Sequence, residues 1–377
     1  MSITIDISAL HTLPPSLINR DDTGAPKSAI FGGVPRQRVS SQAWKRAIRK
    51  YVAENLDPDS IGTRTRLVVD VILKEISNIT GQDTDAEDVK AVEALFKAAK
   101  ISLKDAPAKA DEDDDAPTKN KTAGYLLFLS SHQIHNVAQA VVKSRETSEK
   151  IPAKIAKQLL NSEHSADVSM FGRMVADDSS YNVDAAVQVA HALGVHESSP
   201  EFDYFTAVDD YVESSDETGA GMIGTVQMMS STLYRYATID MDSLAENLGN
   251  EDAAKTCALY FVEAFIKSMP TGKINTFANQ TLPELVYIAI RDTRPVSLVN
   301  AFETPVTATA DHGRREAAAE AMAEQEREIE EQYGFKPKAA FVIGLGDLRK
   351  AFAELATETT LPELTTVLGE ALDEASN

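Results

Sequence analysis

The sequence predicts an α+β fold, because segments with the two-residue period of a strand alternate with segments of helical period. Ile3, Ile5 and Ile7 alternate with polar residues, as expected for a half-buried strand. Residues 41–52 have the three-and-four spacing of an amphipathic helix, and a second such helix follows residue 250. Short apolar runs later in the chain, at 285–290 and 340–343, add further strands. The order strand, helix, strand, helix, strand is compatible with a ferredoxin-like sandwich.

Length and composition indicate a soluble globular protein. The chain has 377 residues, enough for two or three domains or for one core with large insertions. Hydrophobic residues make up 43% of it, too many for wholesale disorder. The longest uncharged stretch, 122–142, contains several polar residues and is expected to be an amphipathic helix rather than a membrane span. Because no secretory pattern opens the sequence and Cys257 is the single cysteine, we expect a cytoplasmic protein without disulfides.

The segment before and within the first helix is the most informative local pattern. Residues 14–27 are rich in turn-forming residues and predict a long structured loop, and Gly32-Gly33 allows a tight turn. Ser40 or Ser41 is a suitable N-cap for the helix that follows. Trp44 and other apolar residues line one face of this helix. The opposite face carries Gln42, Lys45, Arg46, Arg49 and Lys50.

Two regions of the sequence differ in character from the strands and helices of the predicted core. Residues 76–164 show short helical patterns broken by loops, including the acidic run Asp111–Asp115, which is predicted to be solvated because like charges repel. Two extended runs flank a polar, glycine-bearing stretch and predict a β-hairpin arm over 198–231. The apolar residues of this arm have no obvious core to enter. Farther on, Asn250 is predicted to cap a helix, a charged helix spans 314–332, and the last helix follows Pro362.

Positive charge is concentrated near the N-terminus of an acidic chain. The whole chain has 37 basic and 58 acidic residues, a net charge of −21. Residues 11–50 contain eight basic and two acidic residues, so this stretch carries +6 and the other 337 residues carry −27. Such a block indicates a localised anion site, because Lys and Arg supply most of the affinity for a polyphosphate. The alternative is a solvated helix face with a few surface ion pairs.

Binding of single-stranded nucleic acid fits these features. Amides near Gly32-Gly33 and at the helix start would add neutral donors to phosphate oxygens. The exposed apolar residues of the arm would stack on bases, which is how single-strand binders gain affinity without reading sequence. The RNA-recognition fold is one member of the predicted fold class. The basic residues ahead of the helix are Arg20, Lys27, Arg36 and Arg38.

No constellation of residues supports catalysis, a metal site or a cofactor. His132 and His135 have the spacing of one helix face, but no acidic residue or cysteine completes a metal shell nearby. The sequence contains no HExxH, nucleophile-elbow or Walker A motif. The glycine pair at 344–346 lacks the third glycine of a dinucleotide-binding loop. The paired carboxylates Asp209-Asp210 are explained more simply by solvation.

Several blocks of the sequence resemble the CasC family. CasC is the repeated backbone subunit of Cascade, the RNA-guided interference complex of type I-E CRISPR systems. The longest blocks are PSLINRDD at 15–22, KSAIFGG at 27–33 and RQRVSSQAWKRA at 36–47. Further similar segments are Gly172-Arg173-Met174, DYFTAVDD at 203–210, YRYA at 234–237 and NAFE at 300–303.

The resemblance implies a hand-shaped, non-catalytic protein with an RNA-recognition-like palm, a helical fingers insertion and a β-hairpin thumb. Several copies would polymerise along the spacer part of a CRISPR RNA, together with other Cascade subunits. Each thumb would turn one guide base out of line and leave the others free to pair with target DNA. No membrane partner is implied. The implied boundaries are 1–75, 165–197 and 232–377 for the palm, 76–164 for the fingers and 198–231 for the thumb.

The resemblance also implies which residues contact the guide. Its backbone would be held by Asn19, Arg20, Lys27, Arg38, Ser40, Gln42, Lys45, Arg46 and Arg49. Met174 would wedge beside a base, and the thumb would use Tyr204, Phe205, Thr206 and Ile223. Tyr204 stands where tryptophan is expected, and the fingers, including Asp111–Asp115, show no matching motif. Contacts with phosphates carry no sequence information, so such a scaffold accepts any spacer and leaves recognition to base pairing.

Two other classes of function remain open at this point. An RNA-processing endonuclease would use His11, His132 or His135 as general acid or base. Such an enzyme would cleave repeat RNA without other proteins. An acidic interaction protein would instead dock its basic helix on an acidic partner protein, and competition by unrelated single-stranded RNA would separate that class from an RNA-binding one.

Overall fold

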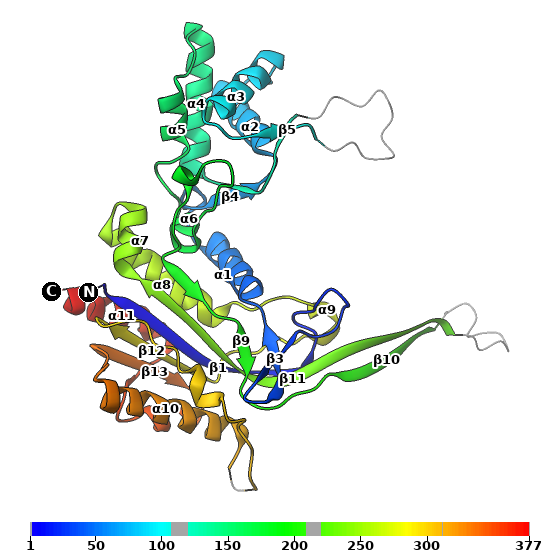
Figure 1. Cartoon of the computed structure of the whole chain (residues 1–377), viewed down its shortest axis with the longest axis vertical. Coiled ribbons are helices and arrows are strands. Elements are labelled where there is room, and N and C mark those ends of the chain that lie inside the picture. Colours follow the sequence, from blue (N-terminus) through cyan, green and yellow to red (C-terminus); the bar gives the residue numbers. More distant parts are fainter. Residues whose placement is uncertain (1, 107–119, 209–219, 311, 377) are drawn as a thin grey trace. The chain divides into compact units, whose positions relative to one another are not determined.

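The computed structural model describes residues 2–106, 120–208, 220–310 and 312–376 (Figure 1). It confirms the mixed α+β class, with a large sheet and eleven α-helices in these ranges. The chain divides into two compact units. Unit 1 comprises Met1–Tyr51, Gln188–Met241 and Lys255–Asn377, and unit 2 comprises Val52–Val187 and Asp242–Ala254. The acidic run Asp111–Asp115 and the pair Asp209-Asp210 lie outside the described residues.

Unit 1 is built on a ten-stranded sheet. The strand order is β14-β13-β12-β1-β11-β9-β3-β2, and β8 and β10 also pair with β11. The predicted first strand becomes the central strand β1, which lies antiparallel between β11 and β12. It was expected to be half-buried, but its polar residues Thr4, Asp6 and Ser8 are buried as well, because helices cover both faces of the sheet. The strands are β1 (Thr4–Ser16), β2 (Ser28–Phe31), β3 (Val34–Val39), β8 (Val187–Val189), β9 (Ala192–Gly194), β10 (Glu201–Val208), β11 (Ala220–Asp240), β12 (Leu285–Arg291), β13 (Ala339–Gly344) and β14 (Thr357–Glu358).

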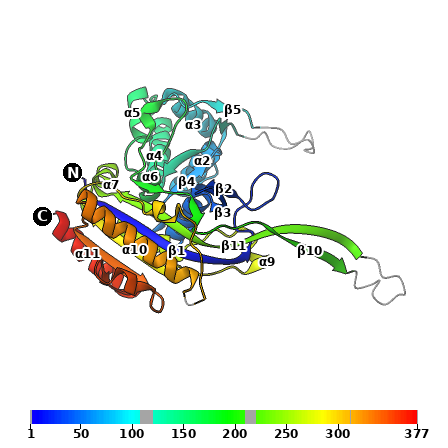
Figure 2. The same ribbon diagram turned by 60° about the horizontal axis from the view of Figure 1, so that its bottom comes forward.

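Helices cover both faces of this sheet. On one face the Arg235 guanidinium lies 3.7 Å from the ring centroid of Trp44 in α1 and 4.3 Å from that of Phe265 in α8. On the other face Met322 of α10 joins Leu10 in one apolar cluster, and Figure 2 shows α10 running along β1. The helices that include residues of unit 1 are α1 (Ser41–Asn55), α8 (Glu251–Lys267), α9 (Ile274–Phe277), α10 (Arg314–Tyr333) and α11 (Leu361–Ser376), with 3-10 turns η3 (Val299–Phe302) and η4 (Leu348–Phe352).

A buried ionic network ties α10 to the sheet. Arg291 donates from Nε to Asp6 Oδ2 at 3.0 Å and from Nη2 to the Glu326 carboxylate at 2.7 and 2.8 Å. The three residues are at most 2% exposed. Burial raises the pKa of both carboxyl groups, against the opposing attraction of the single guanidinium they share. Tyr236, from the YRYA segment, donates its hydroxyl to Asp6 at 2.8 Å and so belongs to the same internal support.

The two extended runs predicted as an arm pair with each other. β10 lies antiparallel to the first part of β11, from Glu201 opposite Met228 to Thr206 opposite Ile223 and beyond. β11 is a single strand of 21 residues, so the strand that forms half of the arm continues into the centre of the sheet. Figure 1 shows this two-stranded ribbon extending away from the rest of unit 1.

Unit 2 is largely helical, with an apolar core formed by four of its helices. Val69, Phe96 and Val137, from three of these helices, are fully buried in it. The elements of unit 2 are η1 (Pro58–Ser60), β4 (Gly62–Thr65), α2 (Val68–Thr80), α3 (Ala86–Ala98), β5 (Leu103–Lys104), β6 (Thr122–Ala123), β7 (Leu127–Ser130), α4 (Ser131–Thr147), α5 (Ala153–Leu159), α6 (Ala166–Phe171), η2 (Ser179–Tyr181) and α7 (Met241–Leu248).

One secondary-structure prediction was wrong in part. The stretch 122–142 was expected to be a single amphipathic helix, but its first nine residues contain β6 and β7, and α4 begins only at Ser131. Ser130 sets this boundary through a capping box, because its hydroxyl accepts from the Gln133 amide while Gln133 Oε1 accepts from the Ser130 amide. The short apolar run before it fits a buried strand as well as a helix. None of the helices in the described ranges has the length and apolar character that crossing a bilayer requires.

Candidate nucleic-acid interface

Backbone hydrogen bonds bring the separate parts of the N-terminal basic stretch together. The Lys27 amide donates to Asn19 O at 3.0 Å, and the Arg38 amide donates to Lys27 O at 2.9 Å. The Asn19 side chain closes the group, because its Oδ1 accepts from the Ser40 amide at 2.9 Å. Three segments far apart in this stretch therefore meet at the start of α1. We call the surface formed by Asn19, Arg20, Lys27, Arg38, Ser40, Gln42, Lys45 and Arg46 the cationic ledge.

Asp21, in the loop that carries Arg20, accepts hydrogen bonds from other residues of the same loop. Asp21 Oδ1 accepts from the Thr23 amide and hydroxyl and from the Ala25 amide, at 2.7 to 3.0 Å. These hydrogen bonds, led by the one from the Thr23 hydroxyl, lower the pKa of Asp21. One of the two acidic residues in the basic stretch is thus engaged by its loop, while Arg20 on the same loop is exposed.

The first helix has the two faces that its sequence predicts. Ser40 is the N-cap, since its Oγ accepts from the Ala43 amide at 3.3 Å. Trp44 and Ile48 are buried, whereas Gln42 and Arg46 are exposed. The remaining polar positions of the face are Lys45 and Arg49, which are half-buried, and Lys50, which is exposed.

The cations of the ledge lack carboxylate partners. Within the described ranges, no ion pair forms at Arg20, Lys27, Arg38, Lys45 or Arg46. In contrast, many other cations of the chain are paired, as Lys267 is with Glu263 at 2.5 Å and Lys255 with Asp373 at 2.6 Å. The expectation of surface ion pairs along this stretch is therefore not met at these five positions, and their charge remains available to an anionic ligand.

Arg36 does not belong to the ledge, contrary to the expectation from the sequence. Its side chain is fully buried, and it donates to the carbonyl oxygens of Phe31, Gly194, Phe302 and Glu303 at 3.0 to 3.1 Å. These carbonyls come from β2, β9 and the η3 segment, which is the NAFE block of the sequence. Arg36 therefore joins the β2–β3 hairpin to two distant segments of unit 1, and because it is fully buried it cannot reach a phosphate on the surface.

The turn between β2 and β3 makes the same connection. Gly32 has a φ of +59°, and a Cβ at this position would lie 1.7 Å from Glu303 O. Both glycines have the positive φ that the turn needs, and Gly32 is also required for the close approach of the hairpin to the η3 segment.

His191 is a member of this region that sequence reasoning missed. It precedes β9, and its Nδ1 accepts from the Ser41 amide at 2.9 Å, at the first residue of α1. The pairing of β9 with β3, at Val39 opposite Ala192, brings this histidine to the helix start from 150 residues away along the chain. The one signal in the sequence was a polar residue directly before a short apolar run, which is too common to single out.

The arm presents its predicted residues on two different faces. Tyr204 and Ile223 are 63% and 62% exposed, and with Thr206, which is opposite Ile223, they share one face of the ribbon. Phe205 lies on the other face above Gly224, because a Cβ on Gly224 would approach the Phe205 ring to 2.4 Å. Phe205 is still 41% exposed. The four residues expected to act together in the thumb therefore flank both sides of the ribbon.

Met174 belongs to unit 2 and is 80% exposed. Arg173, the residue before it in the Gly172-Arg173-Met174 segment, has a structural role. It is buried and donates to Tyr181 O at 2.9 Å and to Asn161 Oδ1 at 2.9 Å. Arg173 thus fixes the backbone from which Met174 projects, and it is a structural residue rather than a ligand contact.

The histidines of the alternative nuclease reading lie in different environments. His11 is 1% exposed, and burial together with the nearby Arg235 charge lowers its pKa to about 3. His135 forms a 2.7 Å contact with Glu75, and His132 is exposed on α4. Within the ranges the structure describes, no group of three His, Cys, Asp or Glu side chains is placed to hold a metal ion.

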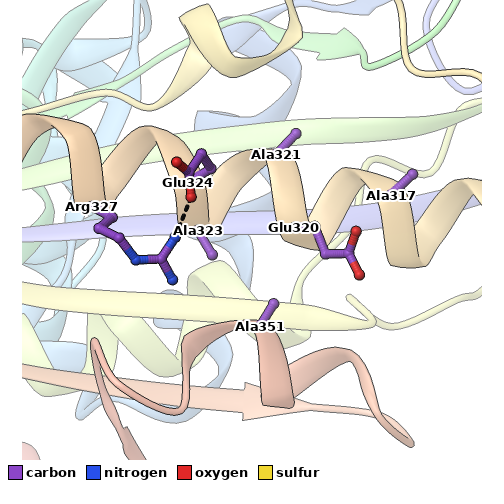
Figure 3. A pocket seen from close by; sticks show the side chains of 7 residues that line it. All are labelled: Ala317, Glu320, Ala321, Ala323, Glu324, Arg327 and Ala351. Carbon is purple, nitrogen blue, oxygen red and sulfur yellow. Dashed lines mark hydrogen bonds and ion pairs between the residues drawn. The ribbon is translucent and has the colours of Figure 1, made fainter.

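A groove runs along α10 in unit 1. It has a volume of about 490 Å³ and is lined by Ala317, Glu320, Ala321, Ala323, Glu324, Arg327 and Ala351 (Figure 3). Its single cation, Arg327, is already paired with Glu324. The groove thus combines small apolar side chains with net negative charge, which does not suit a polyanion.

Comparison with known proteins identifies a family and two similar solved structures. A family model described as CT1975-like protein (Cas_CT1975) matches residues 5–367. A chain of a solved structure described as a CRISPR RNA-guided surveillance complex, pre-nicking, has a TM-score of 0.79 and 32% identity, with 98% of this chain and 99% of that chain covered. A chain of a second CRISPR RNA-guided surveillance complex has a TM-score of 0.71 and 28% identity, with the same coverage of both chains. The comparison with curated proteins finds no match. Since the family match spans nearly the whole chain, as the CasC-like blocks do, this chain belongs to the CT1975-like family, the family of CasC.

Proposed function

We propose that this protein is a CRISPR RNA-binding backbone subunit of a Cascade-type surveillance complex, and that several copies polymerise along the guide spacer. The two similar solved chains come from RNA-guided surveillance complexes and are covered almost completely by this chain. We assign the complex to type I-E on the CasC resemblance of the N-terminal blocks. Other subunits of the complex and, through the guide, target DNA are the further partners in this proposal.

The observation that carries the proposal is the cationic ledge. Its five cations have no carboxylate partner within the described ranges, although the chain as a whole has 21 more acidic than basic residues. Phosphate groups are the ligands that such a surface fits best, and phosphate contacts hold a strand without regard to its bases. A subunit that must accept any spacer needs this kind of contact.

The arm supplies the second part of the proposal. Tyr204 and Ile223 on one face are largely exposed, and Phe205 on the other face lies over Gly224 and is still 41% exposed. We propose that residues 198–231 act as a thumb that inserts between guide bases, with Met174 as a wedge beside a base. Aromatic and apolar side chains bind unstacked bases of any identity.

The two units suggest how the remaining parts divide. We propose an RNA-recognition-like palm over 1–75, 165–197 and 232–377, which contains most of the sheet of unit 1, and fingers over the helical region 76–164. Unit 2 is larger than these fingers, since it also includes 52–75, 165–187 and 242–254. We propose no catalytic role for this chain. The burial of His11 keeps it from contact with a substrate and so disfavours it as a general acid or base.

Co-expression with a CRISPR RNA tests the proposal. The full chain is purified with and without a repeat–spacer RNA, the bound nucleic acid is sequenced, and the particles are imaged by negative stain. We expect bound guide RNA and elongated particles whose length increases with spacer length. Particles of one size that contain no RNA would refute the proposal. Cleavage of repeat RNA by the chain alone, lost in His132→Ala or His135→Ala, would instead establish the nuclease alternative.

A further inference from the structure

Of the two ring nitrogens of His191, Nδ1 accepts a hydrogen bond from the backbone and Nε2 has no partner within the described residues. Its Nδ1 accepts a 2.9 Å hydrogen bond from the Ser41 amide, and its side chain is exposed. Among the described residues, its Nε2 has no hydrogen-bond partner. The two nitrogens lie on opposite edges of the ring, so fixing Nδ1 to the helix start also fixes the direction of Nε2.

The bond to Ser41 determines the protonation state of the ring. A backbone amide can only donate, so Nδ1 must be the unprotonated nitrogen and the proton must sit on Nε2. Desolvation and the charges of Arg38 and Lys27 lower the pKa of His191, which favours this neutral form. The exposed edge of the ring is therefore an N–H donor without a formal charge.

The position of His191 decides what this donor would meet. Arg38 and Lys27 belong to the cationic ledge and lie close enough to act on His191 through their charges. The amino-terminal end of α1, which also attracts anions, lies on the Nδ1 side. Because the two neighbouring side chains are cations, this environment favours an anionic acceptor over a neutral one. An anionic oxygen that bridges Lys27 and Arg38 would be such an acceptor.

We propose that His191 is a guide-contacting residue, which donates an Nε2–H hydrogen bond to a phosphate oxygen of the RNA held by Lys27 and Arg38. This inference rests on the proposed function and adds to the ledge one neutral donor that its sequence did not reveal. A neutral donor strengthens binding without releasing a counterion, so its contribution differs measurably from that of a lysine or an arginine.

Two substitutions separate the two nitrogens of the ring. In His191→Asn, the side-chain oxygen can replace Nδ1 as acceptor for Ser41, but no donor remains at the outer edge. In His191→Gln, a side-chain N–H can replace the outer donor, but the acceptor at the position of Nδ1 is lost. Both variants are compared with the wild-type full chain by thermal unfolding and by anisotropy titration of a labelled single-stranded RNA and of the DNA of the same sequence.

We expect His191→Asn to unfold like the wild type and to bind RNA roughly tenfold more weakly, the effect of one hydrogen bond to a charged acceptor. Its log–log salt slope should equal that of the wild type, and the loss should be the same for DNA, since both strands carry the phosphate. His191→Gln should keep most of the affinity and lose thermal stability instead.

Other results would overturn the inference. Wild-type affinity in His191→Asn would show that the outer nitrogen touches no ligand, and a loss confined to RNA would assign it to a ribose hydroxyl rather than to phosphate. A lower salt slope would mean that the histidine acts as a cation. Each of these results leaves RNA binding by the wild type intact, whereas failure of the wild type to bind RNA at all would count against the proposed function itself.

Discussion

Replacing Lys45 and Arg46 together with alanine removes two cations from the exposed side of α1 without disturbing its core. Lys45 is half-buried, Arg46 is exposed, and neither forms an ion pair within the described ranges. Alanine is the best helix former, so the helix itself should remain intact. Arg49 is left unchanged, because it interacts with another part of the chain.

The magnitude of the effect follows from counterion release. Each contact with a single-stranded phosphate contributes about 0.7 to the slope of log K against log salt, so the double variant should lose about 1.4. If the electrostatic contribution vanishes near 1 M salt, this slope change corresponds to roughly 25-fold weaker binding at 0.1 M and about fourfold at 0.4 M. The loss should be the same for guide RNAs of unrelated sequence, because phosphates carry no sequence information.

The assay is an anisotropy titration of two unrelated labelled RNAs at four or more salt concentrations. The control is Lys336→Ala with Lys350→Ala, which removes the same charge from exposed positions outside the ledge and, at Lys350, also removes an ion pair with Asp347. We expect the control to keep the wild-type slope. Parallel plots of log K against log salt for the wild type and the Lys45/Arg46 variant would refute the reasoning. A loss of affinity that differs between the two RNAs would refute it as well.

Three further changes test the supports of this surface. Arg291→Met leaves two buried carboxylates without their cation, so it should lower the free energy of unfolding by about 3–5 kcal/mol in a urea titration. A loss below about 1 kcal/mol would contradict the stabilising role of this ionic network. Both Gly32 and Gly33 have positive φ, but only a Cβ on Gly32 would meet a backbone oxygen, at 1.7 Å. Gly32→Ala should therefore lower the melting temperature far more than Gly33→Ala. Equal effects would show that the positive φ alone, and not the close approach, determines the loss of stability. Phe205→Ala should weaken RNA binding and change the melting temperature little, since the ring is 41% exposed, and a large thermal loss would mark it as a core residue.

Local patterns predicted the elements that position the interface. The period of the apolar residues was enough to place β1 and α1. It did not show that β1 is buried on both faces, because the helices that cover the polar face of β1 come from distant parts of the chain. Ser40 as N-cap and Asn250 as the cap of α8 were also predictable, because a capping side chain acts within three residues of its own position. The exposure of Tyr204 and Ile223 followed from the absence of any apolar pattern that would cover the arm.

Long-range pairing explains what the sequence could not show. Arg36 and Arg38 are two residues apart and point to the same side of β3, so no local pattern distinguishes them. Arg36 is buried by contacts that include two distant segments, β9 and the η3 segment, the latter more than 260 residues later. His191 likewise reaches the start of α1 through the pairing of β9 with β3. Charge counting over a stretch therefore overestimates an interface by the cations that the fold uses internally.

The contrast between Arg36 and Arg38 indicates how a chain of net charge −21 can maintain a cationic surface. Arg36 donates to four carbonyl oxygens, none of which carries a formal charge, so the hairpin is fixed without an ion pair to a carboxylate. Asp21 is likewise satisfied by amides and a hydroxyl of its own loop. Had Asp21 been anchored by an ion pair with Arg38 or Lys27, the ledge would have lost a cation. Anchoring the region through neutral partners leaves its free cations for phosphate, which is the condition that sequence-independent RNA binding imposes.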